Sequence, residues 1–261
     1  MTQAMNAAIF AARLPQTRWL RFAAPAAFYA LADRLLPWCW GAAALFSLAG
    51  LVLGLGVAPT DAQQGDAYRI IFIHVPAAWM SMVIYVLMAT WAGLGLVLNT
   101  RLSSMMMATA LAPTGALMTF IALWTGSLWG KPTGGAWWVW DARLASELIM
   151  LFLYIGFMAL QAGIDDPRRG DRAAAVLALA GMVTLPVIYF SVKWWNTLHQ
   201  GSSINLSREP AMAGTMLAGM LLMVAAFGAW SIAVALHRVR SIILEREQGN
   251  EWTTQLPEAR P

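Results

Sequence analysis

The chain has 261 residues, of which 59% are apolar and only 11% are charged, and its formal net charge is +4. A soluble domain needs about 25% charged residues to solvate its surface, so soluble enzyme folds are excluded. The positive balance does not indicate a nucleic-acid partner, because no dense run of basic residues accompanies it. A single cysteine, Cys39, excludes an internal disulfide and a cysteine-based metal site. The sequence therefore predicts an all-α, polytopic membrane protein in a lipid bilayer, with no nucleic-acid partner.

Six apolar stretches are long enough to cross a bilayer, whose hydrocarbon core of about 30 Å requires roughly 20 helical residues. Their Leu, Ala, Met, Gly and Val content is typical of packed membrane helices, and they lack the two-residue alternation of membrane β-strands. The predicted spans are residues 39–58, 76–98, 104–125, 144–162, 173–192 and 211–236. An even number of spans places both termini on the same side of the membrane.

The distribution of Lys and Arg predicts which side that is, because these residues are enriched in cytoplasmic segments. Twelve of the 17 basic residues lie on the side of the termini. The other five are Arg69, Lys131, Arg143, Lys193 and Arg208. We therefore expect both termini to be cytoplasmic and segments 59–75, 126–143 and 193–210 to lie on the outer face.

The two terminal segments are expected to flank a membrane domain of residues 39–236. Residues 1–38 resemble a signal peptide only superficially, because Arg13, Arg18 and Arg21 interrupt the apolar run. We interpret this segment as an amphipathic helix on the cytoplasmic surface, and a loosely ordered tail is an equally good interpretation. Residues 237–261 are predicted to form a solvated cytoplasmic tail that begins with His237.

Fourteen tryptophans are unevenly distributed, and many lie at the outer ends of the spans. Four of them fall within twelve residues of the outer loop 126–143, namely Trp129, Trp137, Trp138 and Trp140. The glycines and proline between them predict a non-helical backbone, on which indole rings can form a flat apolar platform for a planar ligand. The ordinary interfacial belt explains the other outer tryptophans at least as well, namely Trp79, Trp124, Trp194 and Trp195.

Two of the three histidines are predicted to share the outer face with this loop. His74 precedes the second span, and His199 follows the fifth. Imidazole is a common axial ligand of haem iron, and two opposed imidazoles complete its coordination. Each histidine alone is more simply explained as a hydrogen-bonded structural residue. The pair beside a planar-ligand platform favours haem ligation.

Charged residues near the outer loop have more than one interpretation. Asp141 stands where a helix N-cap is expected. Arg143 and Glu147 are spaced i,i+4, so we predict a local ion pair, in preference to a functional intramembrane carboxylate. Four cations are candidates for contact with an anionic carboxylate such as a haem propionate: Lys131, Arg143, Lys193 and Arg208.

The outer loop contains a motif that resembles a known family. Trp129-Gly130, then Trp-Trp-Val-Trp-Asp-Ala-Arg-Leu over residues 137–144, then Ser-Glu-Leu over residues 146–148, is similar to the motif of the tryptophan-rich (WWD) haem-handling proteins. The six spans, the placement of the two histidines and the length resemble the cytochrome c maturation protein C branch of that family, over nearly the whole chain. The stretch 133–135 lacks a tryptophan that the family often has there, which implies a smaller platform.

The resemblance implies a role in cytochrome c biogenesis at the bacterial inner membrane. Such proteins hold haem b at the outer face and pass it to a periplasmic haem chaperone, in a complex with ATP-binding cassette subunits and a small single-span subunit. The resemblance implies that His74 and His199 are the axial ligands. It assigns haem and chaperone docking to Trp129, Trp137, Trp138, Trp140 and Asp141. It implies haem handling rather than enzymatic catalysis.

Two alternatives belong to other functional classes. A b-type cytochrome subunit would need histidine ligands within helices that face the core, whereas His74 and His199 are predicted at span ends. A transporter of haem or another solute would need a polar pathway in the middle of the membrane, where Glu147 is the only acidic residue well inside a span.

Overall fold

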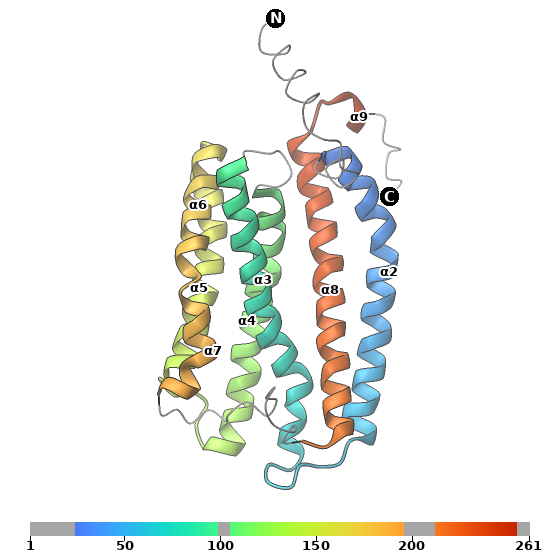
Figure 1. The fold of residues 1–261 in the computed structure, drawn as a ribbon, viewed down its shortest axis with the longest axis vertical. Coiled ribbons are helices and arrows are strands. Elements are labelled where there is room, and N and C mark those ends of the chain that lie inside the picture. Colours follow the sequence, from blue (N-terminus) through green and yellow to red (C-terminus); the bar gives the residue numbers. More distant parts are fainter. Residues whose placement is uncertain (1–23, 99–104, 196–211, 255–261) are drawn as a thin grey trace, which may run out of the picture.

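The protein is a bundle of six long helices (Figure 1). The computed structural model describes residues 24–98, 105–195 and 212–254, and these ranges contain helices and no β-strand. Six helical spans are long and apolar enough to cross a membrane: Pro25–Val57, Asp66–Val97, Met105–Gly134, Ala142–Gly163, Pro167–Ser191 and Gly214–Arg246. The predicted all-α fold with six spans is confirmed.

The helices follow one another with short connections. Helix α2 (Pro25–Leu51) continues into a π-helical segment, η2 (Val52–Val57), and a 3-10 helix, η3 (Asp66–Ile70), leads into α3 (Ile71–Leu98). The remaining elements are α4 (Met105–Gly134), α5 (Ala142–Gly163), α6 (Pro167–Gly181), α7 (Thr184–Trp194), α8 (Gly214–Arg246) and α9 (Glu251–Thr254). Helices α6 and α7 together form the fifth span, with a short break at residues 182–183.

Several helices extend beyond the limits expected from hydropathy. Helix α2 begins at Pro25 rather than at residue 39, with proline in the first turn, where its missing N–H costs no helical hydrogen bond. Helix α8 continues ten residues beyond the predicted residue 236. Hydropathy locates the apolar part of a helix, whereas the helix itself continues into its polar ends.

The expectation of a non-helical backbone from residue 129 onward is wrong as far as Gly134, because α4 continues to that residue. A glycine in a helix costs only about 1 kcal/mol, and Pro132 removes one backbone hydrogen bond, so the helix continues through both kinds of residue. Gly135 follows the last helical residue and terminates the helix: its N–H bonds the Lys131 carbonyl at 3.1 Å, and its φ of 77° suits glycine. The non-helical part of the tryptophan-rich segment is therefore only residues 135–141.

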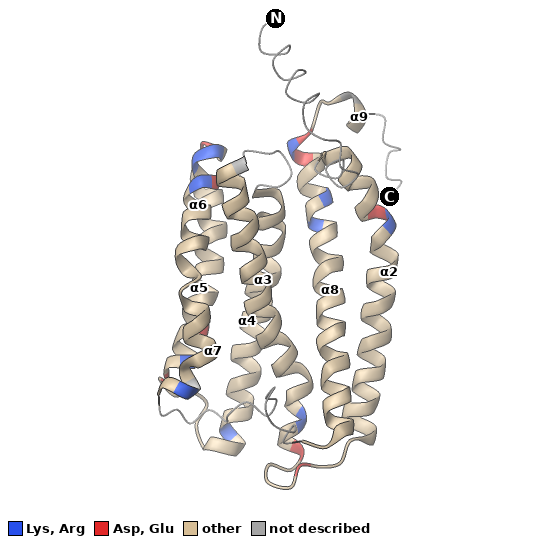
Figure 2. Cartoon of the chain, viewed as in Figure 1, with Lys and Arg blue, Asp and Glu red and all other residues tan. Residues whose placement is uncertain are grey.

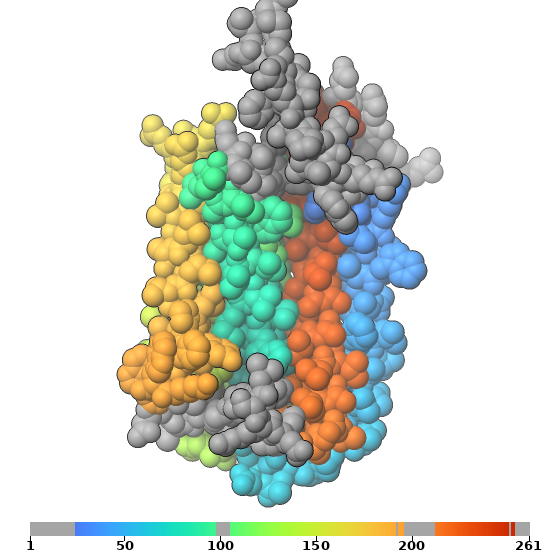
Figure 3. All heavy atoms as spheres, in the orientation of Figure 1, coloured from blue at the N-terminus to red at the C-terminus, as the bar shows by residue number. Residues whose placement is uncertain are grey.

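The bundle consists of two packed groups. Helix α8 packs along α2, and it also contacts α3 and α4, as the adjoining columns of α2, α8 and α3 show in the space-filling view (Figure 3). Helix α5 packs against α4, α6 and α7 in the second group (Figure 1). The main core lies between α3 and the helices of this group, where the buried rings of Tyr85 and Tyr154 meet edge to face at 5.1 Å. Gly115 and Gly181 have no side chain where these two rings lie, so a Cβ at either position would collide with a tyrosine.

The two ends of the bundle carry most of its charge (Figure 2). At one end, Arg240 of α8 bonds Asp33 of α2 at 2.9 Å, so the start of α2 and the end of α8 lie together. Arg246 bonds Asp171 of α6 at 3.2 Å at the same end. The other end, which carries His74 and Trp129, is called the tryptophan end below.

Candidate functional site

His74 lies in the first turns of α3 at the tryptophan end. Its Nδ1 is 3.0 Å from the Thr125 Oγ1 on α4, and its ring meets the edge of the Trp129 indole, with 5.6 Å between ring centres. A Cβ on Gly126 would lie 3.1 Å from the His74 Cε1, so the glycine gives the imidazole room against α4. Helix packing thus brings together a histidine and a tryptophan that the sequence placed on the same face.

Trp129 is held from the other side by the segment that precedes α3. Its indole N–H donates to the Gln64 Oε1 at 2.7 Å, and the buried Tyr68 ring meets it at 5.7 Å in an edge-to-face arrangement. Arg69 fixes this segment by donating to the carbonyl of Gly54, at 2.6 Å, in the π-helical part of the first span. Sequence reasoning missed these roles of Gln64 and Tyr68, since no pattern relates them to Trp129.

The other three tryptophans of the motif lie on the connection between α4 and α5. The Ser127 hydroxyl donates to the Trp137 carbonyl at 2.6 Å, which folds this connection back along α4. Trp138 and Trp140 meet edge to face at 5.3 Å. Trp140 is 80% exposed and Trp137 55%, whereas Trp138 is half-buried. The motif therefore presents one tryptophan inward, beside His74, and two outward.

Asp141 begins α5, as predicted for an N-cap. Its Oδ1 accepts a hydrogen bond from the Leu144 N–H at 2.8 Å, which satisfies one of the amide groups that a helix start leaves without a helical acceptor. The N-cap prediction is confirmed. The capping position also places Asp141 directly after the three tryptophans of the connection.

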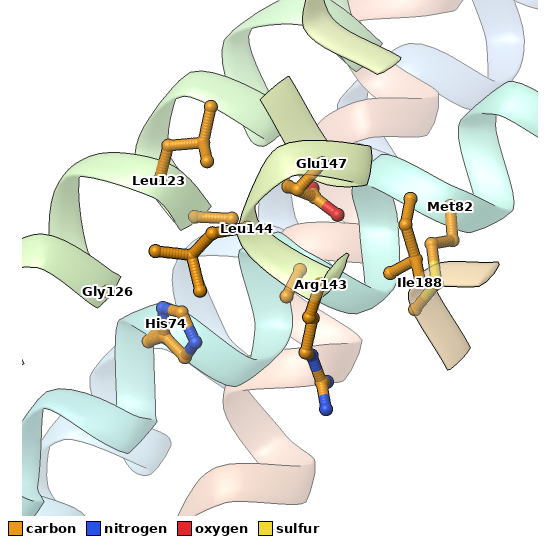
Figure 4. A pocket seen from close by; sticks show the side chains of 10 residues that line it. His74, Met82, Leu123, Gly126, Arg143, Leu144, Glu147 and Ile188 are labelled. Carbon is orange, nitrogen blue, oxygen red and sulfur yellow. The ribbon is translucent and has the colours of Figure 1, made fainter. Parts of the chain in front are cut away.

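A pocket opens beneath His74 between α3, α4, α5 and α7 (Figure 4). Its polar lining residues are His74, Arg143 and Glu147, and its apolar lining residues are Ala78, Met82, Ala122, Leu123, Leu144 and Ile188, with Gly126 at its edge. Apolar walls with a few polar groups are typical of small-molecule sites.

The predicted Arg143–Glu147 ion pair is wrong. Glu147 is 7% exposed, and its Oε1 accepts a hydrogen bond from the Ser81 hydroxyl of α3 at 2.8 Å. The Tyr154 hydroxyl donates to the Ser81 carbonyl at 2.8 Å and extends this buried polar group. The guanidinium of Arg143 points away from the carboxylate (Figure 4). The i,i+4 spacing favoured a local pair, but a hydroxyl on the neighbouring helix satisfies the buried carboxylate.

Of the other residues predicted to contact haem, two lie in the described part of the chain and two do not. Lys131 donates to the Gly135 carbonyl at 3.2 Å and lies 6.0 Å from the Trp137 ring centre, and Lys193 lies 5.9 Å from the Phe190 ring centre at the end of α7. His199 and Arg208 fall in residues 196–211, outside the described residues. The structure therefore brings His74 and Arg143 together around one pocket, and Trp129 contacts the His74 ring.

These features define a class: a six-span membrane protein with a histidine and tryptophan site at one end of the bundle. Residues 18–254 match the family model described as CcmC, haem exporter protein C. The chain is 46% identical over 240 residues to haem exporter protein C of Escherichia coli K12, covering 90% of this chain and 95% of that protein. It is 41% identical over 240 residues to haem exporter protein C of Haemophilus influenzae, covering 92% and 97%.

A third relative is eukaryotic. It is a ccmC-like mitochondrial protein of cytochrome c biosynthesis from Marchantia polymorpha, 45% identical over 174 residues, which cover 67% of this chain and 72% of that protein. The chain belongs to the haem exporter protein C family. This confirms the resemblance found in the motif. With six spans and bacterial relatives, it is a multi-pass protein of the inner membrane.

Proposed function

We propose that this protein binds haem b at its tryptophan end and delivers it to a periplasmic haem chaperone during cytochrome c biogenesis. Membership of the haem exporter protein C family supports a haem-handling role in that process. Within the protein, the observation that carries the proposal is the position of His74, an imidazole beside an indole ring at the end of the bundle. His74 and His199 are the proposed axial ligands.

The surroundings of His74 suit a ligand that must be held and then released. The imidazole is oriented by a hydrogen bond and an aromatic contact, so its direction is set before haem arrives. It lies in the first turns of α3, near one end of the bundle rather than in its middle. A haem held at that end would keep an exposed edge from which a chaperone can take it. Release by ligand exchange requires no catalytic residue, and we propose none.

The connection between α4 and α5 supplies the proposed docking surface. Trp137 and Trp140 are exposed, and the Trp138 indole N–H is buried with no acceptor among the residues that the structure describes. The two exposed indole rings suit contact with a planar ligand or a partner protein. Together with Trp129 and Asp141, these three residues would contact haem and the chaperone.

Four basic residues are proposed contacts for the haem propionates. Arg143 is the best supported, because it lines the pocket beside His74 and forms no ion pair within the described ranges. Lys131, Lys193 and Arg208 complete the set. The proposed partners are ATP-binding cassette subunits and a small single-span subunit, as the family resemblance implies.

The two alternative functions, a b-type cytochrome subunit and a transporter, depend on different observations. A b-type cytochrome subunit would need histidine ligands inside helices that face the bundle core. His74 was predicted to precede the second span but lies within α3, in its first turns near the end of the bundle. A transporter has one observation in its favour, the buried Glu147 in the pocket wall. Transport of haem into vesicles that is lost in Glu147→Gln would favour the transporter over the delivery protein.

The test is haem loading followed by transfer. The full-length protein, purified with haem in detergent, is mixed with the apo-chaperone, and covalent haem on the chaperone is measured. We expect His74→Ala and His199→Ala to lose haem and transfer. His237→Ala is the matched control, because His237 lies near Trp40, at the end of α8 opposite the tryptophan end, and should behave as the wild type. Normal transfer by both ligand variants would overturn the proposal.

A further inference from the structure

Thr125 is a polar residue of α4 that faces His74 and is 9% exposed. Its Oγ1 lies 3.0 Å from the His74 Nδ1. The same oxygen lies 2.6 Å from the Ile121 carbonyl oxygen one turn earlier in α4, and 3.3 Å from that of Ala122. One hydroxyl therefore contacts both an imidazole and the backbone of its own helix.

The lengths of these contacts indicate where the hydrogen atoms lie. A threonine hydroxyl donates one hydrogen and can accept two. The 2.6 Å contact to the Ile121 carbonyl falls within the range of about 2.5–3.0 Å for an O–H···O bond, and the 3.0 Å contact to His74 matches the most frequent N–H···O length of about 2.9–3.0 Å. The hydroxyl hydrogen thus points to the Ile121 carbonyl, and the Thr125 oxygen accepts the N–H of the His74 Nδ1.

This direction determines the tautomer of the imidazole. A neutral histidine that carries its hydrogen on Nδ1 has its ligating lone pair on Nε2. An acceptor at the other ring nitrogen orients a ligating histidine and raises its basicity. The opposite arrangement, with Thr125 donating to Nδ1, would put the hydrogen on Nε2, which a metal could then not bind without its loss.

We infer that Thr125 is a positioning residue for haem, because its hydroxyl accepts the Nδ1 hydrogen of His74 and makes Nε2 the iron-binding atom. The inference rests on the proposed role of His74 as an axial ligand. It adds a residue outside the tryptophan motif, on the helix that also carries Trp129. The Trp129 ring and the Thr125 hydroxyl constrain the same imidazole.

The chain offers a matched control on the same helix. The Thr119 hydroxyl donates to the Gly115 carbonyl at 2.8 Å, as Thr125 does to the Ile121 carbonyl, and Thr119 is completely buried. No contact of Thr119 with a histidine occurs among the described residues. Thr119→Val and Thr125→Val therefore remove equivalent intrahelical bonds, and only the second removes an imidazole contact.

The experiment compares full-length Thr125→Val, Thr125→Ser and Thr119→Val, purified in detergent with haem. We expect Thr125→Val to bind ferric haem about tenfold more weakly, the lower end of losses seen when a ligand's hydrogen-bond partner is removed. Because a less basic imidazole destabilises ferric iron more than ferrous iron, the midpoint potential should rise. A tenfold change in the ratio of the two affinities equals a shift of about 59 mV. Thr125→Ser keeps the hydroxyl and should have the haem affinity and midpoint potential of the wild type, and so should Thr119→Val.

Two outcomes separate this inference from the proposed function. If His74→Ala changes the haem spectrum but Thr125→Val keeps the wild-type affinity and potential, the role of Thr125 is wrong and the ligand assignment stands. If His74→Ala leaves the spectrum unchanged, the ligand assignment itself is wrong. Thr125→Ala removes the hydroxyl without adding a methyl group and is measured in parallel, so that poor folding of the valine variant does not decide the result.

Discussion

Gly126→Ala tests whether the imidazole position controls haem binding. The added Cβ would lie 3.1 Å from the His74 Cε1, closer than ordinary van der Waals contact, so the ring must move by a few tenths of an ångström. The hydrogen bond to Thr125 and the ring of Trp129 oppose that movement. In the helix itself, alanine is favoured over glycine by about 1 kcal/mol, so the bundle should remain stable. We expect haem affinity to fall about tenfold, the lower end of the losses seen when a residue that orients a metal-binding side chain is changed.

The assay is haem titration of the purified protein, followed by absorption spectroscopy, with thermal unfolding measured in the same detergent. Gly134→Ala is the control, because Gly134 lies in the same helix and a Cβ there would contact nothing within 4 Å. The reasoning is refuted if Gly126→Ala binds haem as tightly as Gly134→Ala and gives the same spectrum. It is also refuted if both variants lose haem equally, since helix propensity would then be the common cause.

Four further predictions follow from contacts of single residues. Ser81→Ala should lower the free energy of unfolding by about 1–3 kcal/mol, because buried Glu147 loses its donor, and thermal unfolding measures this. Gln64→Ala should cost about 1 kcal/mol by the same assay, since it removes the acceptor of a partly buried indole N–H. Trp138→Ala should reduce transfer of haem to the chaperone while membrane insertion, assayed by fractionation, is normal; unimpaired transfer would exclude a docking role. Asp141→Asn keeps an N-cap but loses the charge, so it should preserve stability and impair transfer; equal transfer would show that Asp141 acts only as a cap.

The sequence predicted the parts of this fold that depend on one helix at a time. Six apolar stretches, each about the length of a bilayer span, follow from hydropathy alone, and the N-cap at Asp141 follows from local chemistry. The proximity of His74 and Trp129 followed from topology, because both residues lie at the same ends of adjacent spans.

What the sequence could not predict depends on contacts between helices. The Glu147 carboxylate is bonded by Ser81 of α3, and no spacing within α5 signals a partner 66 residues away. The roles of Gln64 and Thr125 likewise arise from the packing of two segments against one side chain. The continuation of α4 to Gly134 was missed because glycine and proline disfavour a helix locally, and the helix contains both without ending.

The most direct test of the central claim is the absorption spectrum of the haem-loaded, full-length protein compared with those of two single variants. We predict a low-spin, six-coordinate haem in the wild type and a changed or lost spectrum in both His74→Ala and His199→Ala. A spectrum that stays the same in both variants would contradict the claim that this end of the bundle holds haem through these two imidazoles.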